Sequence, residues 1–288
     1  MNNNTITLKN SFLSAKIKIH GAEIISITDK DGVERIWYGD ENLWEDHAPV
    51  LFPVCGFLVE DTYLLNGKSF TMNPHGFAKC YDYVLESFSE DKAVFLLTSN
   101  NETKACYPFD FEFRVSYTLS ENKLVVTYTV NNLTDGEMYF SVGSHEGYLC
   151  EGNISDYNLI FENGEEPINH LLAGAFLSGK TEKAPITNGV MEMCDREFKR
   201  LDTYIFKNPL SKSVTLKKKG AQKSITVEFP EAPNLLIWKE PGAEFLCIEP
   251  WCGLPDHDGE IRELSEKDGI VKLEKNGVFT NTHTIIID

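Results

Sequence analysis

The stretch FDFEFRVSYTLSENKLVVTYTVNNL, residues 109–133, contains two runs in which apolar and polar residues alternate. Successive side chains of a β-strand point to opposite faces, so this alternation predicts two strands that are each buried on one face. Similar runs recur along the chain with Gly, Asn, Asp or Pro between them, which is typical of an all-β sandwich or barrel. These runs are ITLKNSFLSAKIKI, KAVFLLTS, MYFSVGSH, DYNLIFE, DTYIFKN, SVTLKKK, SITVEF and NLLIWKE.

The number of predicted strands indicates the architecture. It is roughly twenty, which is too many for a sandwich of about seven to nine strands. We therefore predict an all-β fold, a large antiparallel β-sandwich built from two big sheets. No linker, internal repeat or low-complexity tract divides the sequence, so residues 1–288 are predicted to form a single domain. Strands at the edges of such a sandwich would allow a homodimer.

Local signals predict the turns. Asp135-Gly136 predicts a hairpin between the strands on either side of it. Pro241-Gly242 predicts a type II turn between NLLIWKE and EFLCIE. Helical periodicity is scarce, so we expect short turns at most in residues 42–49 and 170–176. Residues 163–199 are polar and irregular, which predicts loops and short strands there.

The composition is that of an acidic globular protein, with 288 residues, 42% of them hydrophobic and 25% charged. The formal net charge is −17, from 27 basic and 44 acidic residues, and the isoelectric point is near 4.9. An acidic surface repels nucleic acid and anionic lipid, and it steers phosphorylated substrates away. We therefore predict no nucleic-acid or membrane partner, and a neutral small molecule as the substrate.

The cysteines and the N-terminus predict the compartment. The seven cysteines are scattered without a close C-x-x-C pair, which fits reduced thiols better than disulfides. No clustered His/Cys set has zinc spacing. The N-terminal segment lacks the basic start and apolar core of a signal peptide, and no apolar stretch approaches ~18 residues. These observations predict a soluble, cytoplasmic protein without a metal site.

Two histidines stand beside glycine or proline at predicted strand ends. His75, in NPHGFAK, follows a proline that fixes the backbone and precedes a glycine that permits an unusual conformation. His145, in SVGSHEGYL, follows an apolar strand. Because histidine titrates near neutral pH, His145 could act as an acid or base, and the turn could hold out His75 towards a ligand. Each could instead be structural, as a turn histidine bonded to backbone or as a satisfied residue at a strand edge.

The strongest candidate is Glu249, in EFLCIEPWCGLPD. Phe245, Cys247 and Glu249 would share one strand face, and a carboxylate that continues an apolar face is costly unless it is paired or functional. Desolvation raises the pKa of such a glutamate, as a general base working near neutral pH requires. Pro250 is expected to end the strand, and Trp251 offers a flat apolar surface of the kind on which sugar rings stack. The alternative is a buried glutamate that pairs with a lysine.

Four motifs that contain candidate residues follow one another in the chain. They are N-P-H-G-F-A-K at His75, V-G-S-H-E-G-Y at His145, L-D-T-Y-I-F at Asp202 and I-E-P-W-C-G-L-P-D at Glu249. In this order they resemble the aldose 1-epimerase (galactose mutarotase) family, and P-V-L-F-P-x-x-G at residues 49–56 resembles its LacX-like branch. The resemblance covers nearly the whole chain and implies the family's fold, a large antiparallel β-sandwich of the galactose mutarotase-like supersandwich type.

The resemblance implies an isomerase that interconverts the α and β anomers of a free sugar without a metal or organic cofactor. By position, Glu249 would be the base that takes the proton from the anomeric hydroxyl. His145 would be the acid that protonates the ring oxygen. His75 would hold the sugar and its developing charge, and Asp202 would bind a sugar hydroxyl.

Three positions depart from the family pattern. Phe57 stands where the LacX-like branch has an arginine, Lys79 stands where an arginine commonly follows H-G-F-A, and Glu146 replaces the proline usual after the acid histidine. Lysine keeps the charge of arginine but not its bidentate fork. We still assign Lys79 to sugar binding, with Trp251 and Phe77 as aromatic platforms. The departures leave two alternatives, a carbohydrate-binding protein without turnover and a hexose-phosphate mutarotase.

Overall fold

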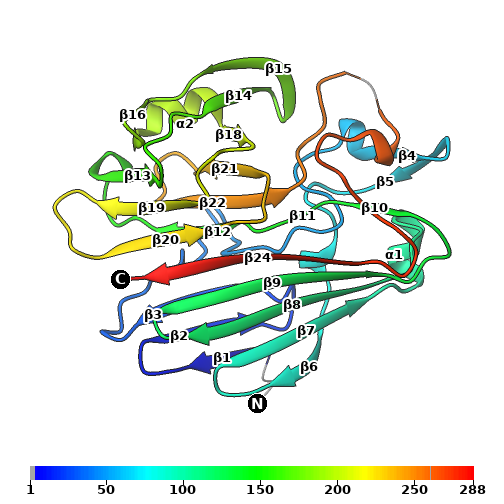
Figure 1. Ribbon diagram of the computed structural model, residues 1–288, viewed down its shortest axis with the longest axis horizontal. Helices are drawn as coiled ribbons and strands as arrows, with labels where there is room; N and C mark the ends of the chain where they lie inside the picture. Colours follow the sequence, from blue (N-terminus) through cyan, green and yellow to red (C-terminus); the bar gives the residue numbers. More distant parts are fainter. Residues whose placement is uncertain (1–3, 260) are drawn as a thin grey trace.

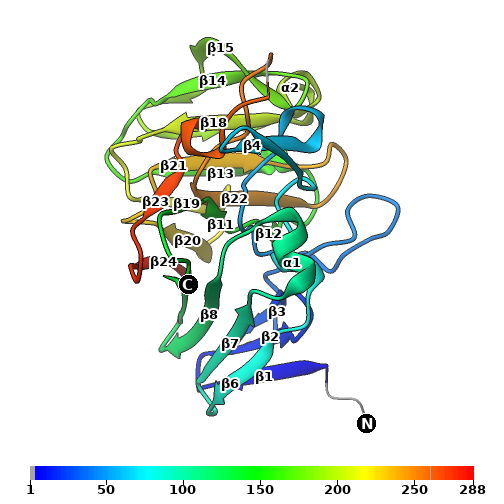
Figure 2. The same ribbon diagram turned by 90° about the vertical axis from the view of Figure 1, so that its right-hand side faces the viewer.

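The computed structural model describes residues 4–259 and 261–288, and these form two stacked layers of β-sheet (Figures 1 and 2). The named strands in this part of the chain pair antiparallel throughout, which confirms the predicted sandwich. The first layer is a ten-stranded sheet with the spatial order β16 (Ile186–Thr187), β17 (Val190–Glu192), β13 (Tyr157–Phe161), β19 (Ser213–Lys218), β20 (Ser224–Glu228), β24 (Val278–Ile287), β9 (Lys123–Asn132), β8 (Phe111–Ser120), β7 (Lys92–Thr98) and β6 (Val84–Phe88).

The second layer contains a seven-stranded sheet and a three-stranded sheet. The seven-stranded sheet has the order β11 (Val142–Gly143), β22 (Phe245–Cys252), β21 (Asn234–Trp238), β18 (Thr203–Lys207), β14 (Ile168–Ala173) and β15 (Phe176–Lys183), and β12 (Glu146–Leu149) also pairs with β22. The three-stranded sheet is β1 (Thr5–Lys9), β2 (Leu13–Lys18) and β3 (Ile24–Asp29). Two separate pairs of short strands are β4 (Thr62–Leu65) with β5 (Lys68–Thr71), and β10 (Met138–Phe140) with β23 (Val271–Leu273).

The helices are short and lie in connections between strands. They are α1 (Asn101–Cys106), α2 (Asp195–Leu201) and 3₁₀ turns at Val59–Asp61, Ala78–Cys80, Ile154–Asp156 and Leu264–Glu266. The sequence analysis missed α1 and α2, since two turns of helix give little periodic signal. It expected loops and short strands in 163–199, and there the structure has the short strands β14, β15, β16 and β17, with α2 as the element that was not expected. Within the described ranges, no helix has the length and apolar character needed to cross a membrane.

The two turn predictions had opposite outcomes. Pro241-Gly242 connects β21 to β22, and these strands pair directly, so this hairpin is confirmed. Asp135-Gly136 closes no hairpin, because β9 pairs with β8 and β24 whereas β10 pairs with β23. The buried Asn132 side chain explains the departure. Its amide donates hydrogen bonds to the carbonyls of Gly136, Leu273 and Glu274, which draws the chain away from the β9 ladder.

The stretch 109–133 supplies β8 and β9, and buried residues alternate along both strands as predicted. The buried face of β8 meets the second layer. There the ring of Phe113 stacks on that of Phe52 with the centroids 4.5 Å apart, and the Tyr117 hydroxyl donates to the carbonyl of Ala22. One cluster of buried apolar side chains extends from Leu8 to Ile287 between the layers.

Replacing Phe113 with alanine should lower the free energy of unfolding by about 3–5 kcal/mol, because it removes a buried ring and leaves a cavity. The matched control is Phe88→Ala on the edge strand β6, where the side chain is 55% exposed and Phe113 is 0% exposed. The control should change the free energy by less than about 0.5 kcal/mol. Urea titration measures both variants, and equal destabilisation would contradict this description of the core.

Candidate active site

The floor of the site is the outer face of the seven-stranded sheet, which is turned away from the core between the layers. Along β22, Cys247, Glu249 and Trp251 lie on this face, whereas Leu246 and Ile248 belong to the main hydrophobic core. The predicted division of β22 into two faces is therefore confirmed. The neighbouring strands β21 and β18 contribute Leu236, Trp238, Thr203 and Ile205 to the floor.

Pro250 does not end the strand, as the sequence suggested it would, because β22 continues to Cys252. The register of β11 and β12 on β22 places Ser144 opposite Pro250. The backbone N–H of Ser144 donates to the carbonyl of Pro250 at 3.4 Å, but proline has no N–H with which to return the bond. The indole N–H of Trp251 donates to the Ser144 carbonyl at 2.9 Å instead. The Trp251 side chain, which lines the site, thus supplies the hydrogen bond that the backbone of Pro250 cannot make.

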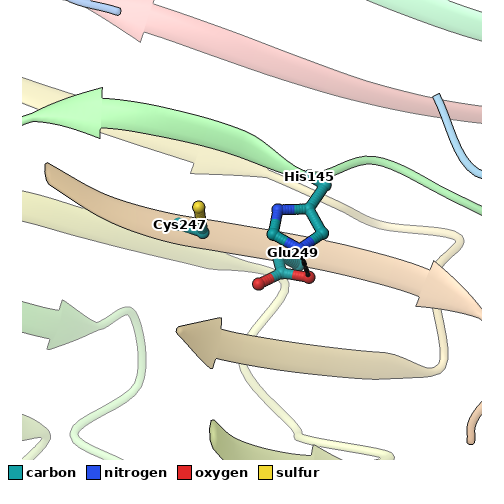
Figure 3. Close-up of side chains that lie close together, drawn as sticks. All are labelled: His145, Cys247 and Glu249. Carbon is teal, nitrogen blue, oxygen red and sulfur yellow. Dashed lines mark ion pairs between the residues drawn. The ribbon is translucent and has the colours of Figure 1, made fainter. Parts of the chain in front are cut away.

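The same register places His145 directly opposite Glu249 on the neighbouring strand. Because the Ser144–Pro250 pair is hydrogen-bonded through the backbone, the next pair along is a non-hydrogen-bonded one, whose side chains approach more closely. Nε2 of His145 lies 3.4 Å from Oε2 of Glu249 (Figure 3). The Glu249 side chain is 2% exposed and the His145 side chain 11% exposed. An acid and a base therefore meet on one wall of the site.

Burial controls the protonation of this pair. It raises the pKa of the Glu249 carboxyl well above its usual range, and the negative charges of Glu146 and Asp202 raise that pKa further. Burial lowers the pKa of His145 to about 3, opposed by a backbone hydrogen bond and assisted by the charge of Lys79. At neutral pH, burial therefore favours a protonated Glu249 carboxyl and a neutral His145 ring.

His75 reaches the site through an unusual backbone conformation. Its φ is 63°, in the left-handed region that non-glycine residues rarely adopt, and Gly76 follows with a φ of 76°. A Cβ atom on Gly76 would lie 2.3 Å from the carbonyl oxygen of Phe52, so only glycine fits there. Two hydrogen bonds to Gly56 hold His75. Its N–H donates to the Gly56 carbonyl, and its Nδ1 accepts from the Gly56 N–H at 3.3 Å.

The bond from Gly56 determines what His75 offers a ligand. Because Nδ1 accepts a proton donor, the neutral ring carries its hydrogen on Nε2. Burial, followed by the charges of His145 and Lys79, lowers the pKa of His75 well below its usual range, so the ring stays neutral. Its centroid lies 5.5 Å from that of His145 and 5.6 Å from that of Trp251. His75 is thus a neutral hydrogen-bond donor beside the acid–base pair.

These side chains line an open cavity of about 490 Å³. Its walls are mainly apolar and include Trp44, Phe57, Leu172, Ile205, Leu236, Trp238 and Trp251. Among the described residues that line the cavity, none is a lysine or an arginine. The ring of His145 sits between Trp44 and Trp238, with centroid separations of 5.3 and 5.5 Å. A flat polar molecule with apolar faces fits these surroundings.

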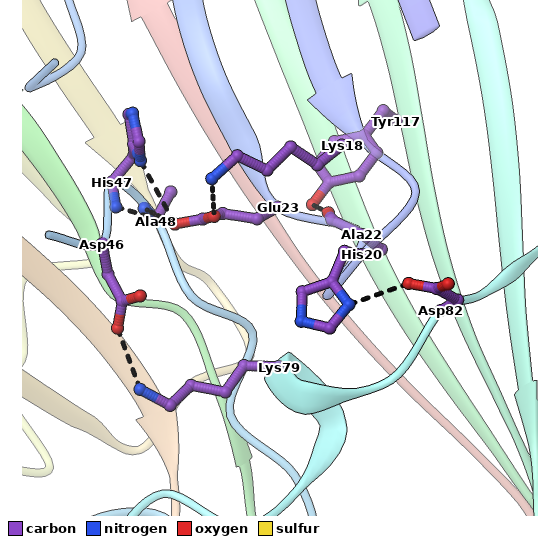
Figure 4. A network of polar contacts seen from close by, with 10 residues as sticks. All are labelled: Lys18, His20, Ala22, Glu23, Asp46, His47, Ala48, Lys79, Asp82 and Tyr117. Atoms are coloured by element: carbon purple, nitrogen blue, oxygen red, sulfur yellow. Dashed lines mark hydrogen bonds and ion pairs between the residues drawn. The ribbon is translucent and has the colours of Figure 1, made fainter. Parts of the chain in front are cut away.

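The sequence analysis did not identify Trp44 and Trp238. The signal it could have used is that the chain has four tryptophans, and three of them line this cavity. Trp44 lies in the loop expected to be a mere turn. The Trp37 indole N–H donates to the Trp44 carbonyl, and Glu23 accepts the N–H groups of His47 and Ala48 (Figure 4).

The remaining predicted residues differ in position. Asp202 lies at the end of α2 with a φ of 65°, and it lines the cavity. Trp251 also lines the cavity. Lys79 does not line the cavity. Its ammonium pairs with Asp46 at 2.8 Å (Figure 4). Its positive charge lowers the pKa of His75 and of His145. Phe77 is 8% exposed and packs in the core between the layers, so the prediction that it forms a platform is wrong in position.

One thiol stands beside the acid–base pair. The donor atoms of His145, Cys247 and Glu249 all lie within 4.8 Å of one another (Figure 3). Burial raises the pKa of the Cys247 thiol well above its usual range, so it stays protonated and inert. It packs beside Trp37 and Phe245 rather than lining the cavity. We interpret the cluster as a proton-transfer pair with a structural thiol next to it.

Comparisons with known proteins point to one family. The family model described as aldose 1-epimerase matches residues 4–261. The plasmid and chromosomal LacX proteins of Lactococcus lactis subsp. lactis are each 31% identical over 282 residues, which cover 93% of this chain and 94% of theirs. A galactose mutarotase related enzyme from Lactobacillus acidophilus has a TM-score of 0.94 at 31% identity, covering 99% of this chain and 97% of its own. A galactose mutarotase-like protein from Lactobacillus casei ATCC 334 has a TM-score of 0.93 at 31% identity, covering 99% and 100%.

Glu249→Gln should stabilise the protein increasingly as the pH rises above about 4.5. The unfolded wild-type chain releases this proton there while the folded protein keeps it, so wild-type stability falls with pH by up to about 1.4 kcal/mol per unit. Glutamine has no proton to release. Urea unfolding from pH 4 to 8 measures the difference, with the exposed Glu121→Gln as control. A difference from wild type that stays constant with pH would contradict the raised pKa of Glu249.

Proposed function

The chain belongs to the aldose 1-epimerase family, and on that premise we propose that it interconverts the α and β anomers of a free, uncharged aldose. The observation that carries the proposal is the His145–Glu249 pair, 3.4 Å apart on the wall of an open, aromatic-lined cavity. Anomer exchange through ring opening needs one group to take a proton and another to give one within reach of a single sugar carbon. This pair meets that requirement with side chains of the chain itself.

The reaction follows from the two proton positions. Glu249 takes the proton of the anomeric hydroxyl while the bond between C1 and the ring oxygen breaks. The electron pair goes to the ring oxygen, which receives the proton of His145. The resulting aldehyde rotates about the C1–C2 bond, and the two transfers run in reverse to close the ring on the other face. Each turnover thus returns both groups to their starting states.

The protonation that burial favours fits this cycle. Ring opening converts a Glu249 carboxylate and a His145 imidazolium into a carboxylic acid and a neutral imidazole. That neutral pair, which burial favours, is the state present with the open-chain aldehyde. The hydroxyls of a bound sugar supply hydrogen bonds to the charged forms and so favour the starting state of the pair.

Other residues are proposed to hold the sugar. The Nε2–H of His75 donates to a sugar oxygen next to the reacting carbon, because it is neutral and adjoins His145. Asp202 accepts a hydrogen bond from a hydroxyl at the cavity mouth. Trp251, with Trp44 and Trp238, covers the apolar faces of the ring. Lys79 supplies positive charge near the histidines. Phe77 packs in the core and does not bind the sugar in this proposal.

A hexose-phosphate substrate is a weaker candidate. No lysine or arginine stands among the described cavity residues, and the net charge of −17 repels a phosphate group. The candidate of a carbohydrate-binding protein without turnover shares the same cavity, but it gives no reason for an acid and a base to meet in it.

Replacing either member of the pair should nearly silence the reaction. Glu249→Gln and His145→Gln are each expected to lower the rate of anomer exchange by about 10²–10⁴-fold, because each removes one proton-transfer group. Polarimetry, or NMR exchange between anomers, on a panel of free aldoses measures the rate. Matched controls are Glu121→Gln and His20→Gln, at exposed positions that should retain wild-type rates. A folded wild type that accelerates no sugar would overturn the proposal.

The cavity should also discriminate against phosphorylated sugars. We expect kcat/KM for glucose to exceed that for glucose 6-phosphate by at least about tenfold, since an unpaired phosphate charge is costly beside apolar walls. Phe57→Arg should reduce this preference for glucose, because it puts a positive charge at a position that lines the cavity and is 40% exposed. The same NMR assay measures both substrates. A preference of the wild type for the phosphate ester would instead favour the hexose-phosphate mutarotase.

A further inference from the structure

A second acid–base pair lies buried behind the proposed active site. Nε2 of His283, on β24, is 2.9 Å from Oε1 of Glu146, on β12. The two residues are 1% and 2% exposed, and the contact joins the two sheet layers through the core. A buried pair of this kind usually adds no stability over well-packed apolar side chains, because removing its members from water is costly. Its presence in the core therefore needs an explanation other than folding.

The position of Glu146 in its strand supplies one. Glu146 follows His145 directly, and since side chains alternate along a strand, one points into the core while the other faces the cavity. Glu146 pairs across the sheet with Ile248, which adjoins Glu249. The contact with His283 thus fixes β12 within one residue of the proposed acid, opposite the strand that carries the proposed base.

The surroundings of Glu146 transmit its charge. The titratable groups that sense it are the Tyr117, Tyr128 and Tyr148 hydroxyls, the Cys247 thiol and the Glu249 carboxyl. The tyrosines and the thiol are neutral, because burial raises each of their pKa values well above the usual range. After burial itself, the charge of Glu146 is the largest cause of the raised pKa of Glu249, ahead of Asp202. Among the described residues, His283 is the group within ion-pair distance of the Glu146 carboxyl.

We propose that Glu146 and His283 are positioning residues for the proposed reaction: their contact holds β12, and with it His145, opposite Glu249, and it fixes the Glu146 carboxylate beside the strand that carries Glu249. This inference rests on the proposed function. It assigns a role to the glutamate that stands where the family has proline, and to a histidine that no motif had indicated. Neither residue touches the sugar.

Glu146→Gln separates the charge from the contact. Glutamine keeps an acceptor for the Nε2–H of His283 but removes the negative charge near Glu249. Because His145 can donate only while the pair holds its one proton, kcat/KM falls with pH through the pKa of Glu249, above which that proton is lost. In the variant this fall should move to lower pH by at least about half a unit, since a like charge is gone. A merely structural anchor would leave the fall at its wild-type pH.

His283→Leu tests the contact, because it leaves Glu146 buried without a partner. It should lower kcat by at least about tenfold while KM changes less, as His145 loses its fixed position. The double variant Glu146→Leu/His283→Leu removes both polar groups and should fold even if a single variant does not. It should show the shifted fall of kcat/KM with pH together with the lowered kcat. The exposed pair His20–Asp82 supplies the control Asp82→Asn, which should change neither quantity.

The outcomes distinguish this inference from the proposed function. If the fall of kcat/KM stays at its wild-type pH in Glu146→Gln and in the double variant, and kcat is unchanged, the inference alone is overturned. If the folded wild type moves no sugar between anomers, the carbon-13 NMR titration of the Glu249 carboxyl still measures its pKa. A lower pKa in Glu146→Gln would then support the electrostatic coupling, and an unchanged one would contradict it.

Discussion

The antiparallel pairing of β22 with β11 and β12 is the constraint on which the site depends. It places His145 across from Glu249, because the strands on both sides of His145 pair with β22. Pro250 interrupts the backbone ladder one position further on, and the Trp251 indole compensates for the missing bond. The proline and the tryptophan therefore act together. One removes a backbone donor, and the other supplies a donor while it forms a wall of the cavity.

Aromatic packing gives the paired side chains their chemistry. The rings of Trp44 and Trp238 keep water from His145, and the sheet buries Glu249. In such surroundings neither charged form is favoured, so the Glu249 carboxyl keeps its proton and the His145 ring stays neutral. This protonation lowers the free energy of unfolding, because a carboxyl kept protonated at neutral pH opposes folding. The fold can sustain this cost because the large core between the layers lies on the other face of the same strands.

Much of this could be predicted from the sequence, for a physical reason. Alternation along strands is local, so the sandwich and the two faces of β22 were visible in residue order. His75, His145 and Glu249 were visible too, because proline or glycine stands near each of them. The side on which Phe77 packs was not visible, since it depends on the hydrogen bonds of its N–H and that of Ala78 to the Phe52 carbonyl. The prediction of a hairpin at Asp135-Gly136 was wrong for a similar reason. The strand after it, β10, pairs with β23, which lies far along the chain.

The distribution of charge points to the class of molecule that the cavity suits. The site offers two acidic groups, Asp202 and Glu249, and a neutral donor in His75, while the nearby cation Lys79 is engaged by Asp46 outside the cavity. Hydroxyl groups can donate to the carboxyl oxygens and accept from the imidazole at once, whereas an anion can do only the second. A neutral polyhydroxyl compound with apolar ring faces therefore satisfies every polar group of the site. In the proposed reaction the acid–base pair acts only on atoms that all cyclic aldoses share, so selection among such compounds would arise where the hydroxyl pattern meets Asp202 and His75 and where ring substituents meet Phe57.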